Sequence, residues 1–235
     1  MKLDFLVIAA HPDDAELGCG GTILKLISLN KKIGILDLTK GELGTRGNAE
    51  IRDQEASKAS QILGISVREN LGFRDGFFTN DEVHKLKLIH AIRKYKPDII
   101  FAPALSDRHP DHSNAAILVR DACFLSGLPK INTENIDAWR PKLLLHYIQN
   151  NYRQPTFVID ITPFFEKKIE AIKAYSSQFH NAQSTEPQTF ISQNYFLNFV
   201  EARARSVGNT ISTEFGEGFE SENPLPLAFL IQKFS

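Results

Sequence analysis

Two short segments of the chain combine imidazole and carboxylate groups at a spacing suited to metal-dependent hydrolysis. The first, His11–Glu16, reads His-Pro-Asp-Asp-Ala-Glu, and the second, His109–His112, reads His-Pro-Asp-His. Histidine and aspartate are zinc ligands, and a catalytic zinc site has three protein ligands and one open position. We therefore predict a metal site whose three ligands are His11, Asp14 and His112.

Two further side chains of these segments are left without a metal to hold and can act beside it. Asp13, which precedes Asp14, suits a general base that takes a proton from water activated by the metal. His109 lies one helical turn before His112 and, when protonated, would stabilise an oxyanion or donate a proton to a leaving amine. The other histidines lack such neighbours and are interpreted as surface or core residues: His84, His90, His146 and His180.

The segments that must position these groups alternate between strand and helix. Strands are predicted at Leu3–Ala10, Ile33–Leu38, Val67–Phe73, Asp98–Ala102, Leu143–Ile148 and Thr156–Ile161. Helices are predicted over Gly18–Ser28, after the cap Asn48, after the capping box Thr79–Glu82, from Thr162 and over Gln188–Arg205. This alternation predicts an α/β fold with a Rossmann-like, doubly wound, mostly parallel sheet and helices on both faces.

Such a sheet also predicts where the chemistry lies. Ligands of doubly wound sheets bind outside the carboxyl ends of the strands. His11–Glu16 follows the first strand, and His109–His112 follows the strand that ends at Ala102. We therefore expect neighbouring strands to bring the two segments together.

Length and composition bound the class of protein. With 235 residues, a hydrophobic fraction of 42% and a net charge of -1, the chain is typical of a globular protein, and we predict one domain over residues 1–235. A chain of this length buries a core without metal staples, so a metal site is expected to be functional. The balanced charge argues against a nucleic-acid partner.

The apolar segments are too short for a membrane partner. Leu3–Ala10 is interrupted by Asp4 and runs directly into His11, unlike a signal peptide, and no segment approaches the roughly 20 apolar residues of a membrane span. We expect Cys19 and Cys123 to be reduced and buried. The sequence therefore predicts a cytoplasmic protein.

Two other classes of protein remain open on the residues alone. Two histidines and one carboxylate also describe the ligands of iron(II) oxygenases, although a parallel α/β pattern is unusual for them and would leave Asp13 without a role. The second alternative is a non-catalytic metal- or nucleotide-binding module. Gly18–Gly21 lacks the spacing of a dinucleotide-binding loop, and we interpret its glycines as close packing of the first helix on the sheet.

The two motifs resemble one known family. His11–Glu16 followed by Gly20 and Gly21, together with His109–His112, is similar to the PIG-L/LmbE family of zinc-dependent N-acetylglucosamine deacetylases. The resemblance runs over most of the chain. It implies an LmbE-like fold, removal of acetate from an N-acetylated amino sugar, and the roles given above for the three ligands, the general base and the oxyanion-stabilising cation.

A narrower resemblance suggests a substrate. Asp37–Gly47, Ile51–Ala56 and Asn70–Gly76 are similar to the bacillithiol-biosynthesis branch of the family, whose substrate is N-acetylglucosaminyl malate. This resemblance implies a homo-oligomer, for example a hexamer, that acts on a small N-acetyl amino sugar. Zinc is the expected cofactor, with iron(II) as an alternative, and another N-acetyl sugar is the alternative substrate.

The malate group suggests residues that could contact substrate. Planar arginine side chains suit its two carboxylates, which points to Arg52 and Arg108, although each could equally be a surface ion-pair residue. Asp75 could accept hydrogen bonds from sugar hydroxyls. Tyr195 is a candidate oxyanion partner because the family uses a tyrosine near this part of the pocket, or else an aromatic on the buried face of the last helix. Arg140 is a further candidate.

Overall fold

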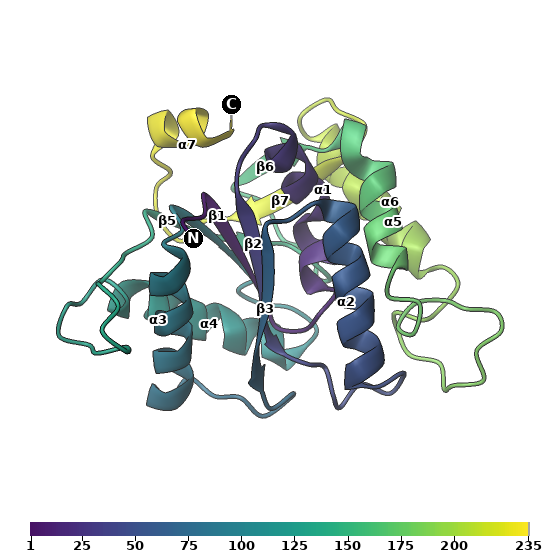
Figure 1. Ribbon diagram of the computed structural model, residues 1–235. Coiled ribbons are helices and arrows are strands. Elements are labelled where there is room, and N and C mark those ends of the chain that lie inside the picture. Colours follow the sequence, from purple (N-terminus) through teal and green to yellow (C-terminus); the bar gives the residue numbers. More distant parts are fainter. Residues whose placement is uncertain (235) are drawn as a thin grey trace.

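The computed structural model describes residues 1–234 and builds them around a seven-stranded sheet (Figure 1). Its strands are β1 (Phe5–Ala9), β2 (Ile33–Thr39), β3 (Val67–Phe73), β4 (Ile99–Ala102), β5 (Leu143–Tyr147), β6 (Phe157–Asp160) and β7 (Gly216–Glu220). Its helices are α1 (Asp14–Ser28), α2 (Ala49–Leu63), α3 (Glu82–Tyr95), α4 (Pro110–Leu125), the 3-10 helix η1 (Thr162–Phe164), α5 (Phe165–Lys173), α6 (Phe196–Asn209) and α7 (Leu227–Phe234). The predicted α/β class with a mostly parallel sheet is confirmed. Ser235, the last residue of the predicted domain, lies outside the described residues.

The order of the strands changes direction next to β1. The order is β3-β2-β1-β4-β5-β7-β6, and β1 pairs in parallel with β2 on one side and with β4 on the other. The strand order therefore reverses between β1 and β4. In doubly wound sheets this reversal opens a crevice at the carboxyl ends of the strands, which is where ligands bind.

Helices cover both faces of the sheet, with α3 and α4 on one side and α1, α2, α5 and α6 on the other (Figure 1). Alternate residues of β1 serve the two cores: Leu6 and Ile8 join the core under α3 and α4, whereas Phe5 and Val7 join the core under α1. All five residues of β1 are buried, as expected for a parallel strand covered on both faces. The strand thus forms a fixed base for the turn that follows it.

Most differences between the predicted and observed elements lie in the second half of the chain. The last long helix begins at Phe196 rather than Gln188, because Thr189 and Ser192 bond to each other's backbone N–H groups and hold a turn instead. The antiparallel strand β7 was not predicted, since its sequence Gly-Glu-Gly-Phe-Glu shows no strand pattern.

The helix caps expected in the first half of the chain lie at or close to their predicted positions. Asn48 caps α2 by accepting the Ile51 N–H, as predicted. The cap of α3 is Asp81, which accepts the His84 N–H, whereas Thr79 of the predicted capping box bonds to Asp81 instead. Both cysteines are free and buried, as expected. Within residues 1–234, none of the helices has the length and apolar character needed to cross a bilayer.

Candidate active site

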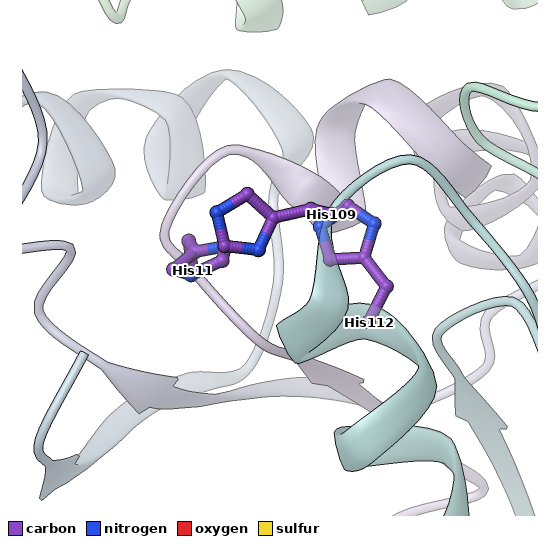
Figure 2. Close-up of side chains that lie close together, drawn as sticks. All are labelled: His11, His109 and His112. Atoms are coloured by element: carbon purple, nitrogen blue, oxygen red, sulfur yellow. The ribbon is translucent and has the colours of Figure 1, made fainter. Parts of the chain in front are cut away.

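The two polar motifs lie together at the crevice between β1 and β4. Figure 2 shows His11, on the loop after β1, facing His109 and His112 at the start of α4. The ring centroids of His11 and His109 are 4.6 Å apart, and those of His11 and His112 are 5.8 Å apart. The expected meeting of two segments about a hundred residues apart in the sequence is therefore observed.

A cavity of about 320 Å³ opens at this point. Its walls come from the turn after β1, the Gly41–Gly47 loop, the start of α4 and the loop before α6. Apart from Tyr195, the predicted site residues all line it: His11, Asp13, Asp14, Arg52, Asp75, Arg108, His109 and His112. The structure therefore collects in one place almost every residue that the motifs suggested.

Asp14 lies between the two predicted histidine ligands. Its Oδ2 is 3.3 Å from His11 Nδ1, and its Oδ1 is 3.2 Å from His112 Nε2. Two ligands of a tetrahedral zinc ion, each about 2.1 Å from the metal, lie about 3.4 Å apart. Each histidine nitrogen therefore lies at a distance from one oxygen of Asp14 that two ligands of a single cation can have.

The remaining nitrogen of each histidine faces carboxylates. His112 Nδ1 is 2.6 Å from Asp107, and His11 Nε2 is 3.0 Å from Asp75 and 3.1 Å from Asp111. Metal-binding histidines characteristically donate their second N–H to a carboxylate, which fixes the ring and leaves the other nitrogen free for the metal. Both rings are therefore oriented as metal ligands require.

The same carboxylates control the charge of the rings. Burial opposes protonation of His112, but Asp14 and Asp107 outweigh it and raise the pKa of this imidazole to about 9. Burial acts in the same way on His11, and its carboxylate neighbours again raise the pKa well above the ordinary value. For Asp14, the imidazoles overcome the desolvation and hold the pKa well below its usual range. A cation would compete with these protons.

Two combinations of side chains have ligand atoms that all lie within 4.8 Å of one another, and neither includes Asp14: His11 with His109 and His112, and His11 with Asp75 and Asp111. In the first, His109 already uses Nδ1 to accept the Asp111 N–H at 3.3 Å. In the second, the carboxylates face the nitrogen of His11 that points away from Asp14. With Asp14 as the third ligand, the second ring nitrogen of both His11 and His112 can donate to a carboxylate.

Asp13 differs from its neighbour in both backbone and charge. Its φ of 114° lies in the left-handed region, a strained conformation for a residue other than glycine, and such strain persists where the surrounding structure holds it. Its Oδ2 accepts a hydrogen bond of 3.1 Å from Arg52 Nη2. Burial nevertheless raises the pKa of Asp13 to about 7, since it outweighs the attraction of Arg52. A carboxylate in this range can both take and return a proton near neutral pH.

His109 is placed to donate a hydrogen bond as a neutral ring. Burial and the neighbouring His11 and His112 lower the pKa of His109, which disfavours the protonated form expected from the sequence. Because Nδ1 accepts the Asp111 N–H, the proton of the neutral imidazole resides on Nε2. The ring is thus a donor without a full positive charge.

Arg52 and Asp75 have structural partners that the sequence did not suggest. Arg52 donates to Asp13, to Gln178 Oε1 at 3.0 Å and to the Gly41 carbonyl at 3.2 Å. Asp75 accepts from His11 with one oxygen and from the Leu43 N–H with the other. Both line the cavity, and Arg52 forms an ion pair with Asp13, as its alternative interpretation expected, although it is buried and not on the surface. Contact of either side chain with substrate stays a prediction.

The remaining substrate candidates differ in exposure. The Arg108 guanidinium lies over Phe190, 4.6 Å from the ring centroid, and no carboxylate within residues 1–234 pairs with it. Tyr195 is 56% exposed at the N-terminus of α6 and does not line the cavity, so neither its predicted place at the metal nor the buried alternative matches the structure. Arg140 bonds to the Phe124 carbonyl, away from the cavity.

Several functional side chains were not found from the sequence. Gln149 Nε2 donates to Asp14 at 2.7 Å, and its Oε1 is buried without a partner. Asp107 orients His112, and Gln178 orients Arg52. Asp107 and Gln149 follow the carboxyl ends of β4 and β5, a position that could have drawn attention to them. Gln178 lies in a loop with no such signal.

Comparisons with known proteins identify a family and several relatives. A family model described as PIG-L, GlcNAc-PI de-N-acetylase, matches residues 6–123. The diacetylchitobiose deacetylase of Thermococcus kodakarensis is 30% identical over 185 residues, which covers 74% of this chain and 69% of that protein. The probable N-acetyl-alpha-D-glucosaminyl L-malate deacetylase 2 of Bacillus anthracis is 28% identical over 193 residues, covering 74% and 80%. Among solved structures, the conserved protein TT1542 of Thermus thermophilus has a TM-score of 0.86 and 38% identity, covering 95% of this chain and 96% of that chain.

Proposed function

The chain belongs to the PIG-L family of deacetylases, and from this premise we propose that it removes acetate from a small N-acetylglucosamine conjugate in a metal-dependent reaction. The observation that carries the proposal is the position of Asp14 between His11 Nδ1 and His112 Nε2, with Asp13 beside them. We propose N-acetylglucosaminyl malate as the preferred substrate, in line with the sequence motifs and with the name of the Bacillus anthracis relative.

The proposed metal ligands are His11, Asp14 and His112. When bound, a divalent cation supplies Lewis acidity toward the acetyl carbonyl and toward water. Two histidines and one aspartate suit zinc, and iron(II) accepts the same set. Asp75, Asp111 and Asp107 keep the two rings in place by accepting their second N–H groups.

Asp13 is the proposed general base. Its pKa of about 7 in the buried site lies close to neutral pH, where proton transfer to and from a carboxylate is most effective. Arg52 fixes the side chain by its 3.1 Å hydrogen bond and keeps part of the population ionised. After taking a proton from water, Asp13 can return it to the departing amine.

His109 is the proposed donor to the carbonyl oxygen. Its Nε2–H can stabilise the negative charge that develops on that oxygen as the amide carbon is attacked. A neutral donor is sufficient for this role, because preorganised N–H groups stabilise an oxyanion without a formal charge.

Arg108 and Phe190 are the proposed contacts for the group attached to the sugar. Arg52 is engaged by Asp13, so Arg108 is the arginine at this cavity that remains available for a substrate carboxylate. Phe190 offers an apolar face over which the Arg108 guanidinium already lies. This pair favours a conjugate that carries an anionic group over the free sugar.

Rates on three substrates test the proposal. The zinc-loaded protein is assayed for primary amine release from N-acetylglucosaminyl malate, diacetylchitobiose and free N-acetylglucosamine. We expect the highest kcat/KM on the malate conjugate. Equal rates on the conjugate and the free sugar would contradict malate specificity and leave deacetylation intact, and faster chitobiose hydrolysis would replace malate by a second sugar.

Arg108→Gln tests the contact itself. We expect a higher KM for the malate conjugate and little change for the free sugar, because only the conjugate carries carboxylates. Arg120→Gln is the matched control, since Arg120 lies on α4 and pairs with Glu222 outside the cavity. An equal rise in KM for both substrates would contradict the assignment.

A separate assay distinguishes a hydrolase from an iron(II) oxygenase. Acetate release under anaerobic conditions, with zinc or iron(II), is expected for a hydrolase. Consumption of oxygen by the iron(II) form without acetate release would favour an oxygenase instead.

A further inference from the structure

Helix α1, which begins with Asp14, is broken near its middle. Cys19 has φ -146° and ψ 24°, outside the helical range, so the helix consists of a first segment, Asp14–Gly18, and a second, Gly20–Ser28. An α-helix bonds each N–H to the carbonyl four residues earlier. A break therefore leaves carbonyls before it and N–H groups after it in need of other partners.

The freed N–H groups of the second segment bond to Glu217 of β7. Gly21 N–H donates to Glu217 Oε1 at 2.9 Å, and Thr22 N–H donates to Oε2 at 2.7 Å. The Glu217 carboxylate is buried and acts as the cap of the second segment, in a position that the helix dipole also favours.

The Leu17 carbonyl, near the end of the first segment, bonds to Lys168 of α5. Lys168 Nζ donates to the Leu17 carbonyl at 3.0 Å and to Glu217 Oε1 at 2.6 Å. Arg203 of α6 adds a longer bond to the same carbonyl, at 3.3 Å. Both members of the Lys168–Glu217 pair are almost completely buried, at 2% and 3% side-chain exposure. One buried ion pair thus joins the two ends of the break.

The glycines of the Gly-Cys-Gly-Gly segment make room for this arrangement. A Cβ on Gly20 would lie 3.3 Å from Lys168 Cγ, and one on Gly21 would lie 2.7 Å from Ile161 Cδ1. A Cβ on Gly18 would overlap Tyr147, at 2.2 Å. Larger residues here would displace Lys168 or force the helix away from the sheet. This accounts for the motif that the catalytic assignments left unexplained.

The first segment depends on contacts with other parts of the fold. It has only five residues, too few to be stable by its own hydrogen bonds. It follows Asp13, whose left-handed backbone is strained, and it carries Asp14 at its start and Leu17 against the cavity. Lys168 and Glu217 themselves do not line that cavity.

We propose that the Lys168–Glu217 ion pair is a positioning device for the turn that bears Asp13 and Asp14. By fixing the Leu17 carbonyl and the start of the second segment, it sets where the first segment begins and therefore where the two carboxylates lie. The inference rests on the proposed metal-dependent deacetylation, because its effect is transmitted through Asp14 to the metal and through Asp13 to the proton transfer.

The test uses a variant that removes both charges but keeps the volume, Lys168→Met/Glu217→Gln. Buried ion pairs replaced together by neutral groups of similar size often leave stability unchanged, so the double variant is expected to fold. Three quantities are measured on the full chain: the Tm of the metal-free protein, the zinc affinity by competition with a chromogenic chelator, and kcat and KM on a substrate that the wild type hydrolyses.

We expect kcat and zinc affinity to fall about tenfold, the lower end of the range for residues that support metal ligands. KM is expected to change less than twofold, because Arg108 and Phe190 lie outside the affected helix. If the double variant fails to fold, Glu217→Asp keeps the charge but withdraws the carboxylate from Gly21 and Thr22, and the same losses are expected.

Arg93→Met is the matched control. Arg93 is a buried cation, 1% exposed, that donates to the carbonyls of Ser126, Leu128 and Ile131 and contacts neither α1 nor the cavity. We expect it to lower Tm and leave kcat and zinc affinity unchanged.

Two results would overturn the inference: a folded Lys168 and Glu217 variant with zinc affinity and kcat within twofold of wild type, or a loss of zinc affinity in Arg93→Met as large as in the variants of the pair. A wild-type protein that binds no zinc would instead overturn the proposed function, so the two failures are distinguishable.

Discussion

Residues 1–125 and residues 126–234 contribute to the site in different ways. The groups proposed to react or bind metal all come from the first part, on the turn after β1 and at the start of α4. The second part adds support: Gln149 bonds to Asp14, Gln178 to Arg52, and the Lys168–Glu217 pair to the two segments of α1. The groups proposed to react thus come from short local motifs, whereas the contacts from the second part join residues more than a hundred positions apart.

The family match follows the same division, since it covers residues 6–123. Variants of the groups proposed to react, all in the first part, should therefore cost the most activity, and variants of the supporting residues in either part should cost less.

Asp13→Asn should lower kcat by about 10³-fold, within the range for general acid–base catalysis. The metal should remain bound, because Asp14 and both histidines are unchanged. Acetate release and metal content per chain measure the two effects. Near-normal turnover would remove Asp13 from the mechanism.

His109→Ala should lower kcat by about 10²–10³-fold, the usual cost of losing one oxyanion donor. His109→Gln is the matched variant, because its amide N–H can reach a similar position and should restore part of the rate. Equal loss in both variants would indicate that His109 supports the fold of the turn and does not donate to substrate.

Asp107→Asn should lower zinc affinity about 10–100-fold, since it removes the carboxylate that orients His112. Competition with a chelator provides the measurement. Asp137→Asn changes an exposed aspartate outside the cavity and should leave the affinity unchanged. If both variants bind zinc as tightly as the wild type, the support of His112 is not needed for binding.

The pH dependence of kcat/KM should follow Asp13. Burial places the pKa of this carboxyl at about 7, above its ordinary value, and the base must be ionised to act. The rate should therefore rise with pH and level off above the pKa, with about a tenfold loss for each unit below it. A bound cation favours the carboxylate, so the limb should lie at about 7 or lower. A rate that increases toward acidic pH would contradict the role of Asp13.

Gln149→Met should have the smallest effect and tests the second part of the chain. The variant keeps the volume but removes the hydrogen bond to Asp14, worth about 1 kcal/mol, so zinc affinity should fall about fivefold. If Gln149→Met also lowered kcat as much as Asp13→Asn does, the division would fail, because a residue after position 125 would then be essential to the reaction. The unpartnered Oε1 of Gln149 is the atom that could account for such a result.

The same division explains what could be predicted from the sequence. The strand Val67–Phe73 was predicted with its observed bounds, and the parallel pattern correctly brought His11 to His112. These inferences depend on local periodicity and on one rule about strand ends.

Other features depend on contacts that local patterns do not record. Arg52 was predicted to bind substrate, but folding directs it to Asp13. The strand β7 lacks strand-like residues because Glu217 is used as a helix cap and Glu220 pairs with Arg153. Tyr195 was proposed from the family resemblance, with a place on the buried face of the last helix as the alternative, but the helix begins only after it.

The carboxylates beside the two histidines bear on how the protein would take up the proposed metal. Because Asp14 and Asp107 hold the pKa of His112 at about 9, its ring carries a proton at neutral pH until a cation takes its lone pair. Binding of the ion would therefore displace this proton, which is released to the solution. The heat of loading should accordingly vary with the ionisation enthalpy of the buffer, and mild acidification should reverse the exchange and strip the ion from an otherwise folded protein.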